Sequence, residues 1–323
     1  MTNPPLSAPP ALGPSFARGA LLSPFKRPRP GAVFSGGRLV LPGLRVDLAR
    51  LAAYERVCGF PTGDDALPIT YPHVLGFPMA MRIMSGRAFP LPLLGLVHTS
   101  ISLTRHRNLP ATGTTYELAV HVDRLTPHRR GTEAVVVTVL REGGEVVWES
   151  ESTYLARHRT GGQVPEQAAG SVEPPLPVAG AALPVAGPSL PVAGPSLPVA
   201  GPSLPVAGPS LPVVDEWRLG ADVGRRYGAV SGDRNPIHLS PLTARLFGFP
   251  RAIAHGMWTA ARCLAAHGTP AAAHVAVDFR APVLLPGAVS FAAADEGRFE
   301  LRGAGDDGER VHVRGRVEAV APA

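Results

Sequence analysis

A seven-residue repeat divides this chain into two parts. The sequence LPVAGPS recurs from Leu183 to Ser210, preceded by the variant LPVAGAA at Leu176 and ended by LPVV at Leu211. A seven-residue period can indicate a coiled coil. Two prolines per repeat exclude that structure here, because proline removes a backbone donor and clashes with the preceding helical turn. We therefore expect residues 161–214 to be an extended, polyproline-like linker without chemistry of its own.

The linker separates two segments that have the patterning of folded domains. Residues 45–160 and residues 215–323 both contain apolar helix candidates and alternating strand patterns. Residues 1–44 are rich in proline and glycine and show little periodicity, which predicts a mostly disordered arm. The expected organisation is an arm, an N-terminal half, the linker and a C-terminal half.

The two halves resemble each other. YERVCG at Tyr54 matches YGAVSG at Tyr227 in its Tyr, Val and Gly. Each half then has a helix candidate, GFPMAMRIMSG in the first and AHGMWTAARCLAAHG in the second, followed by alternating strands. This order predicts a duplicated α+β unit in which an antiparallel sheet wraps around a central helix.

Composition narrows the classes of function. Two cysteines cannot form a disulfide framework and favour a reducing compartment, which predicts a cytoplasmic protein. We see neither a signal peptide nor a membrane span. The net charge of +6 comes from scattered arginines without a nucleic-acid-binding motif, so a nucleic-acid partner is not expected. The basic surface reflects compositional bias or attracts an acidic partner such as a carrier protein.

The segment SGDRNPIH places three polar side chains, Asp233, Asn235 and His238, in one loop. Loops held by a rigid scaffold often carry reacting groups. The alternative is a structural Asx-turn in which Asp233 or Asn235 caps the next helix. Ser240 followed by Pro241 is itself a good start for that helix, which weakens the capping role of Asp233.

A second candidate site is His255-Gly256 at the start of the last helix candidate. The first amides of a helix have no intrahelical acceptor and point into a favourable dipole. Glycine also lets a ligand approach the backbone closely. Gly256 could therefore polarise a carbonyl group, although a simple turn glycine would have the same sequence.

Taken together, YGAVSGDRNPIH and FGFPRAIAHGM resemble the hydratase 2 motif of the MaoC-like dehydratases, the R-specific enoyl-thioester hydratases of the hot-dog fold. This resemblance covers residues 215–323. In the first half, LPITYPHVLGFPMAM is similar to the N-terminal hot dog of two-repeat members, particularly the mycobacterial-type 3-hydroxyacyl-thioester dehydratases.

The resemblance implies a double hot-dog enzyme that reversibly dehydrates (3R)-3-hydroxyacyl thioesters to trans-2-enoyl thioesters. It implies no metal and no cofactor, with coenzyme A or an acyl carrier protein as the handle of the substrate. Catalysis would fall to Asp233, His238, Asn235 and Gly256. The acyl thioester would lie against Phe77, Met79, His255 and Met257.

The first half is expected to be catalytically silent. At the spacing that aligns Tyr54 with Tyr227, Phe60 stands in place of Asp233 and no His follows. If Phe77-Pro78 stands where His255-Gly256 stands, proline has no N–H to offer. The first half would then complete a pseudo-dimer, and FPMAMRIM either lines an acyl tunnel or belongs to the core.

Two other functions remain open at this stage. A hot-dog thioesterase would share the fold and the carbonyl-polarising amide but would release free thiol. A non-catalytic acyl-binding subunit would bind the thioester without turnover. In each case the protein is expected to be a monomeric pseudo-dimer or a homodimer.

Overall fold

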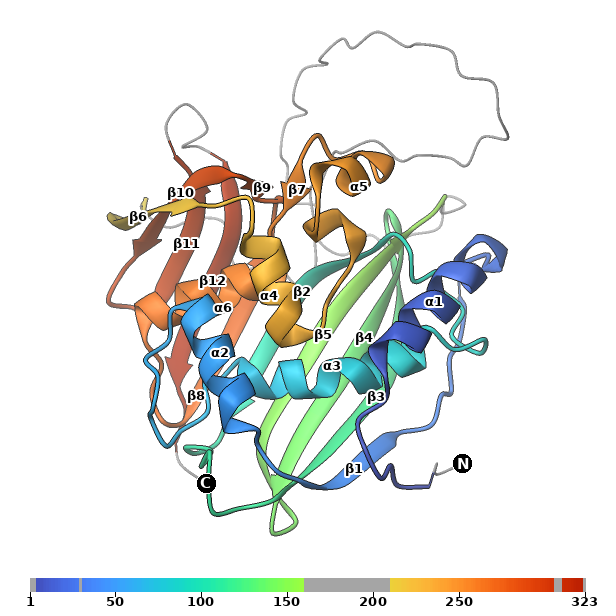
Figure 1. Cartoon of the computed structure of the whole chain (residues 1–323), viewed down its shortest axis with the longest axis horizontal. Coiled ribbons are helices and arrows are strands. Elements are labelled where there is room, and N and C mark those ends of the chain that lie inside the picture. Colours follow the sequence, from blue (N-terminus) through green and yellow to red (C-terminus); the bar gives the residue numbers. More distant parts are fainter. Residues whose placement is uncertain (1–3, 29–30, 160–209, 305–309, 322–323) are drawn as a thin grey trace, which may run out of the picture.

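A computed structural model describes residues 4–28, 31–159, 210–304 and 310–321 (Figure 1). The α-helices are α1 (Leu12–Leu22), α2 (Leu48–Cys58), α3 (Tyr71–Met84), α4 (Val223–Ser231), α5 (Pro241–Leu246) and α6 (Gly256–His267). Two short 3-10 helices are η1 (Ser23–Phe25) and η2 (Pro236–His238). The strands of the first half are β1 (Leu39–Leu44), β2 (Leu96–Arg105), β3 (Tyr116–His128), β4 (Gly131–Glu142) and β5 (Glu145–Arg157). Those of the second are β6 (Val213–Leu219), β7 (Ala252–Ile253), β8 (Ala273–Phe279), β9 (Leu284–Leu285), β10 (Gly287–Ala293), β11 (Arg298–Gly303) and β12 (Val311–Ala319).

One antiparallel sheet of ten strands runs through both halves, in the order β1-β3-β4-β5-β2-β8-β12-β11-β10-β6. The halves meet where β2 pairs with β8, from Ser100 opposite Asp278 to Arg105 opposite Ala273. β7 and β9 form a separate two-stranded ribbon. The sheet therefore joins the two halves through continuous backbone hydrogen bonds.

A central helix covers the strands of each half (Figure 1). α3 packs on β3 and β4, and α6 packs on β11. Four apolar residues recur at helical spacing in the segment AHGMWTAARCLAAHG, and all are buried: Met257, Ala260, Ala261 and Leu264. Each half is thus an antiparallel sheet wrapped around a helix, and the α+β double hot-dog prediction is confirmed.

The internal repeat is visible in the helices that precede the central ones. α2 ends at Gly59 with φ 82°, and α4 ends at Gly232 with φ 83°. Such left-handed caps favour glycine, because a Cβ would crowd the next carbonyl. The two helices pack together, and the rings of Tyr54 and Tyr227 lie 6.2 Å apart between centroids.

Polar side chains also fasten one half to the other. Arg50 on α2 donates from Nε to the carbonyl of Val230 over 3.0 Å. In the reciprocal direction, Trp258 on α6 donates from Nε1 to the carbonyl of Val57 over 2.9 Å. Arg50 thereby fixes the last turn of α4, directly before the loop that carries the predicted reacting groups.

The N-terminal arm differs from the prediction. Where the structure describes it, residues 12–22 form α1, which packs on α3, and β1 pairs with β3. Pro14 lies in the first turn of α1, where its missing N–H leaves no helical hydrogen bond unmade. Proline and glycine in this segment therefore conceal a short amphipathic helix that gains stability only by packing.

The predicted boundaries also shift. Both halves begin with an edge strand, β1 or β6, and not with a helix. β6 begins at Val213, inside the predicted linker. Edge strands tolerate proline and exposed side chains. β1 contains Pro42 and β6 is mostly exposed, so neither segment shows a clear strand pattern in the sequence. The rest of the repeat linker, residues 161–209, lies outside the described residues.

Candidate active site

The loop after α4 places Asp233 at the centre of the candidate site. Its backbone N–H donates to Ser231 Oγ over 3.1 Å, and its Oδ1 accepts the N–H of Asn235 over 3.1 Å. The α5 helix is capped by Ser240, whose Oγ accepts the N–H of Thr243. One carboxylate oxygen of Asp233 therefore forms an Asx-turn that shapes the loop, but it does not cap α5 as the structural alternative expected, and Oδ2 remains for chemistry.

His238, at the end of η2, is held in a defined orientation. Its Nδ1 lies 2.8 Å from the carbonyl oxygen of Ile253, so Nδ1 carries the proton and donates it to that carbonyl. The side chain is buried at 8% exposure. Since Nδ1 is the donor, Nε2 of the neutral ring has an available lone pair and can act as a base.

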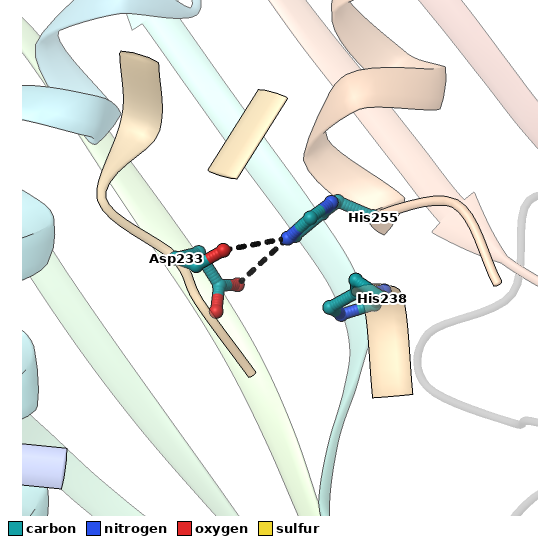
Figure 2. Close-up of side chains that lie close together, drawn as sticks. All are labelled: Asp233, His238 and His255. Carbon is teal, nitrogen blue, oxygen red and sulfur yellow. Dashed lines mark hydrogen bonds and ion pairs between the residues drawn. The ribbon is translucent and has the colours of Figure 1, made fainter. Parts of the chain in front are cut away.

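His255 connects the two reacting groups (Figure 2). Its Nε2 donates to the backbone carbonyl of Asp233 over 2.9 Å and lies 3.9 Å from Asp233 Oδ2. Its ring stacks on that of His238 with centroids 3.6 Å apart. His255 is 2% exposed. It lines the cavity and also positions its neighbours, and its contact with substrate stays a prediction.

Burial shifts the ionisation of Asp233 and His238 in opposite directions. It raises the pKa of the Asp233 carboxyl, and the nearby His238 partly counteracts this. It lowers the pKa of His238, opposed by Asp233 and by the bond to Ile253. The two pKa values therefore approach each other, which makes proton transfer between the groups easier.

Gly256 is the first residue of α6, with His255 as the extended residue before it. Its amide is therefore one of those that have no acceptor inside the helix. A Cβ on Gly256 would lie 3.2 Å from the ring of Phe279, so glycine keeps this corner of the cavity open. The amide can donate to a carbonyl oxygen bound beside Asp233 and His238.

Asn235 lines the same cavity, but its side chain has a structural task. Its Oδ1 accepts the N–H of Ile237 over 3.4 Å and caps η2. The cap holds the turn that delivers His238. Any contribution of the Asn235 side chain to catalysis is therefore confined to its amide NH₂ group.

Asp233, His238 and Gly256 line a cavity of about 340 Å³ to which both halves contribute. Phe77, Met257 and His255 belong to its wall, whereas Met79 is fully buried in the core. The cavity-lining positions of α3 share one helical face: His73, Val74, Phe77, Met81 and Met84. Met79 is two positions from Phe77 and faces elsewhere, so its assignment to the acyl site is wrong.

The first half lacks an equivalent of the Gly256 donor, but not for the predicted reason. α3 begins at Tyr71, and Pro78 lies inside the helix. At the true start, the N–H of Tyr71 donates to the carbonyl of Pro68 over 2.9 Å, and Pro72 has no N–H. The alignment of Pro78 with Gly256 is therefore wrong, and catalytic silence of this half stays a prediction.

No sequence pattern pointed to the residues that the first half places beside Asp233 and Gly256. The ring of His98 stacks on Tyr154 at 4.5 Å and lies 4.9 Å from Phe279, which covers Gly256. Burial raises the pKa of Tyr154, and the charge of Asp233 raises it further. Alternation along β2 and β5 could indicate inward-facing positions, but only the β2–β8 pairing brings them to Asp233.

The buried histidines predict acid sensitivity. Burial lowers the pKa of His73 to about 4, while the unfolded chain binds this proton near pH 6.5. Stability is therefore lost as the pH falls from about 6.5 towards 4, because only the unfolded state takes up the proton. In His73→Phe, the loss of unfolding free energy between pH 7 and pH 5 should be smaller by about 2 kcal/mol, measured by urea denaturation. An unchanged difference would contradict a buried neutral His73.

The same three groups could in principle bind a metal ion, because ligand atoms of Asp233, His238 and His255 lie within 4.8 Å of one another. Their hydrogen bonds favour a different use. Nε2 of His255 must carry a proton to donate to the Asp233 carbonyl, and a protonated nitrogen cannot be a ligand. The arrangement as it stands fits proton transfer better than metal coordination.

Comparisons with known proteins agree with this geometry. The model of the MaoC like domain matches residues 209–314. 3-hydroxyacyl-thioester dehydratase X of Mycobacterium tuberculosis is 34% identical over 261 residues, covering 80% of both chains. The chain belongs to the MaoC-like dehydratase family. A shorter match, 43% identical over 63 residues, is to 3-hydroxybutyryl-CoA dehydratase of Methylorubrum extorquens, and covers 18% of this chain and 40% of that one.

Solved structures extend the likeness to both halves of this MaoC-like chain. The crystal structure of HtdX from Mycobacterium tuberculosis has a TM-score of 0.66 at 29% identity, covering 88% of this chain and all of that one. A MaoC-like dehydratase from Phytophthora capsici shares the fold, with a TM-score of 0.60 at 16% identity over 89% and 96% of the chains. Within the described residues, no helix is long and apolar enough to span a bilayer.

Proposed function

We propose that this MaoC-like protein interconverts (3R)-3-hydroxyacyl thioesters and trans-2-enoyl thioesters by removing or adding water. The observation that carries the proposal is that Asp233, His238 and Gly256 line the same largely apolar cavity, with side-chain atoms of Asp233 and His238 within 4.8 Å of each other. The 34% identity to a 3-hydroxyacyl-thioester dehydratase supports it. The finer assignments, which are the residue roles and the handle of the substrate, belong to the same proposal.

In hydration, the oxygen of a water molecule bonds to the β-carbon while His238 Nε2 takes one of its protons. The electrons of the double bond move onto the thioester carbonyl, and the Gly256 N–H stabilises the resulting enolate oxygen. Asp233 delivers a proton to the α-carbon. The proton on His238 then returns to the Asp233 carboxylate, which restores the starting state.

Dehydration follows the same steps in reverse. The Asp233 carboxylate removes the α-proton, and protonated His238 gives a proton to the departing hydroxyl group. One proton is shared by the pair throughout, and the convergent pKa shifts of the two groups suit this exchange. No metal or organic cofactor is needed for these steps, and coenzyme A or a carrier protein serves only as the handle.

The test is to mix the purified protein with a short and a long trans-2-enoyl-CoA and follow the conjugated enoyl absorbance. We expect the absorbance to fall without release of free thiol, and prior treatment with EDTA to leave the rate unchanged. Thiol release would indicate a thioesterase. Tight binding without turnover of enoyl-CoA or of the carrier-bound enoyl thioester would indicate an acyl-binding subunit.

One chain should suffice for this activity, because both halves contribute to the cavity wall. The functional unit is then a monomeric pseudo-dimer, whether or not two chains associate further. Light scattering at assay concentration, compared with the rate per chain, would test this.

A further inference from the structure

The first helix forms part of the cavity wall. The ring of Phe16 on α1 lines the cavity, with its centroid 6.3 Å from that of Phe77 on α3. Gly19, one turn later, is packed so tightly that a Cβ would fall 2.1 Å from a methyl carbon of Leu93, which also lines the cavity. The sequence, in contrast, predicted a disordered arm here.

The contacts of α1 show how it lies along the cavity. A side-chain methyl of Leu12, at the start of the helix, is close to Gly232, and a Cβ on that glycine would lie 2.4 Å from it. Gly232 is the neighbour of Asp233. Farther along α1, Phe16 packs on Phe77 and Gly19 packs on Leu93. α1 thus begins beside Gly232 and crosses α3, on which it packs (Figure 1).

Polar contacts with the edge of the cavity wall fix the far end of this segment. Ser23 Oγ accepts the N–H of Leu94 over 2.9 Å. Nζ of Lys26 donates to the carbonyl of Met84 over 3.3 Å and to that of Gly86 over 2.9 Å. A cation at the C-terminal end of a helix is favourable, and Lys26 is the only lysine in the chain. Lys26 therefore ties the segment to the end of α3.

We infer that α1 covers the part of the cavity that binds the acyl chain, and that Phe16 contacts this chain. The α1 segment then sets the preference for long over short acyl chains. The inference rests on the proposed function, because it assumes an acyl thioester whose reacting end lies at Asp233. A chain that extends along Phe77 to Met81 and Met84 passes beneath Phe16. A short chain ends before it. Phe16 should thus add apolar contact only to long chains.

The test measures binding of saturated butanoyl-CoA and dodecanoyl-CoA by calorimetry. In Phe16→Ala, the affinity for dodecanoyl-CoA should fall about tenfold, as expected when the contact of one aromatic ring is lost. The affinity for butanoyl-CoA should change far less. Phe16→Leu should recover most of the loss. Saturated thioesters cannot be hydrated, so this result is independent of turnover and can hold even if the proposed reaction does not.

Two further variants sharpen the test. Leu21→Ala truncates an apolar residue of α1 that is 72% exposed, and it should leave both affinities unchanged. Lys26→Met removes the tie to α3 without touching the cavity wall, and it should weaken dodecanoyl-CoA in preference to butanoyl-CoA. Equal losses for both ligands in Phe16→Ala, no loss, or tighter dodecanoyl-CoA binding would overturn the inference, provided that circular dichroism shows a native fold.

Discussion

Replacing Asp233 by Asn should lower kcat for hydration of a trans-2-enoyl thioester by about 10²–10⁴-fold, the range that a positioned acid or base contributes. Asn keeps the size of the side chain, and its carbonyl oxygen can still accept the N–H of Asn235. The loop should therefore keep its shape. What is lost is the group that exchanges a proton with the α-carbon. Steady-state kinetics with a short enoyl-CoA would measure the change.

Combining Asp233→Asn with His238→Gln tests whether the two residues act together. If Asp233 and His238 handle one shared proton, they act as a unit, and the double variant should be hardly slower than either single one. Losses that multiply would indicate independent roles and would contradict the shared proton. Arg234→Ala is the matched control, since Arg234 is an exposed residue of the same loop. Its kcat should stay near that of the unaltered protein.

The local structure around Asp233 and Gly256 could be predicted because its signals are local. Gly232 at a left-handed cap, Ser240 before Pro241 and Gly256 at the start of a helix each leave a mark within a few residues. The alternating patterns that follow each helix candidate are equally local, and the structure has strands there: β2, β3, β4 and β5 in the first half, and β8, β10, β11 and β12 in the second. Patterns of this kind depend on backbone geometry that neighbouring residues decide.

What the sequence concealed depends on contacts between distant segments. α1 is stable only because Phe16 and Gly19 meet α3 and the loop at Leu93. Tyr154 reaches the surroundings of Asp233 because β2 pairs with β8 across the two halves. Short helices gain most of their stability from such packing. For this reason the composition of residues 1–44 predicted a disordered arm, and no local pattern showed that Tyr154 lies near Asp233.

The start of α3 illustrates a different limit. The prediction set Phe77-Pro78 opposite His255-Gly256, which places the start of the first central helix at Pro78. The structure begins α3 at Tyr71 and keeps Pro78 in its interior. Packing against β3 and β4 compensates for the hydrogen bond that Pro78 cannot donate. The pseudo-symmetry of the two halves consequently extends to their helices but not to the donors at the helix starts.

Because the two central helices differ in the N–H donors at their starts, Gly256 is the most informative position in the cavity. In Gly256→Pro the helix should persist, because proline is favoured at the first helical position and His255 already has the extended conformation that a following proline requires. The amide hydrogen is lost, however. We expect kcat to fall about 10²–10³-fold, as on removal of one oxyanion donor. Kinetics should be accompanied by thermal unfolding to show that the fold is retained.

Gly256→Ala distinguishes two roles of Gly256, which are to donate its N–H and to leave space beside Phe279. Alanine keeps the N–H but adds a methyl group 3.2 Å from the ring of Phe279, which must move by a few tenths of an ångström. Its effect should fall mainly on KM, because it narrows the carbonyl pocket without removing the donor, whereas the proline variant should lose kcat. If both variants lost the same modest amount of kcat, Gly256 would serve only to leave space for the substrate, and the enolate would need another donor. A large kcat loss confined to proline would assign the charge stabilisation to this single backbone amide.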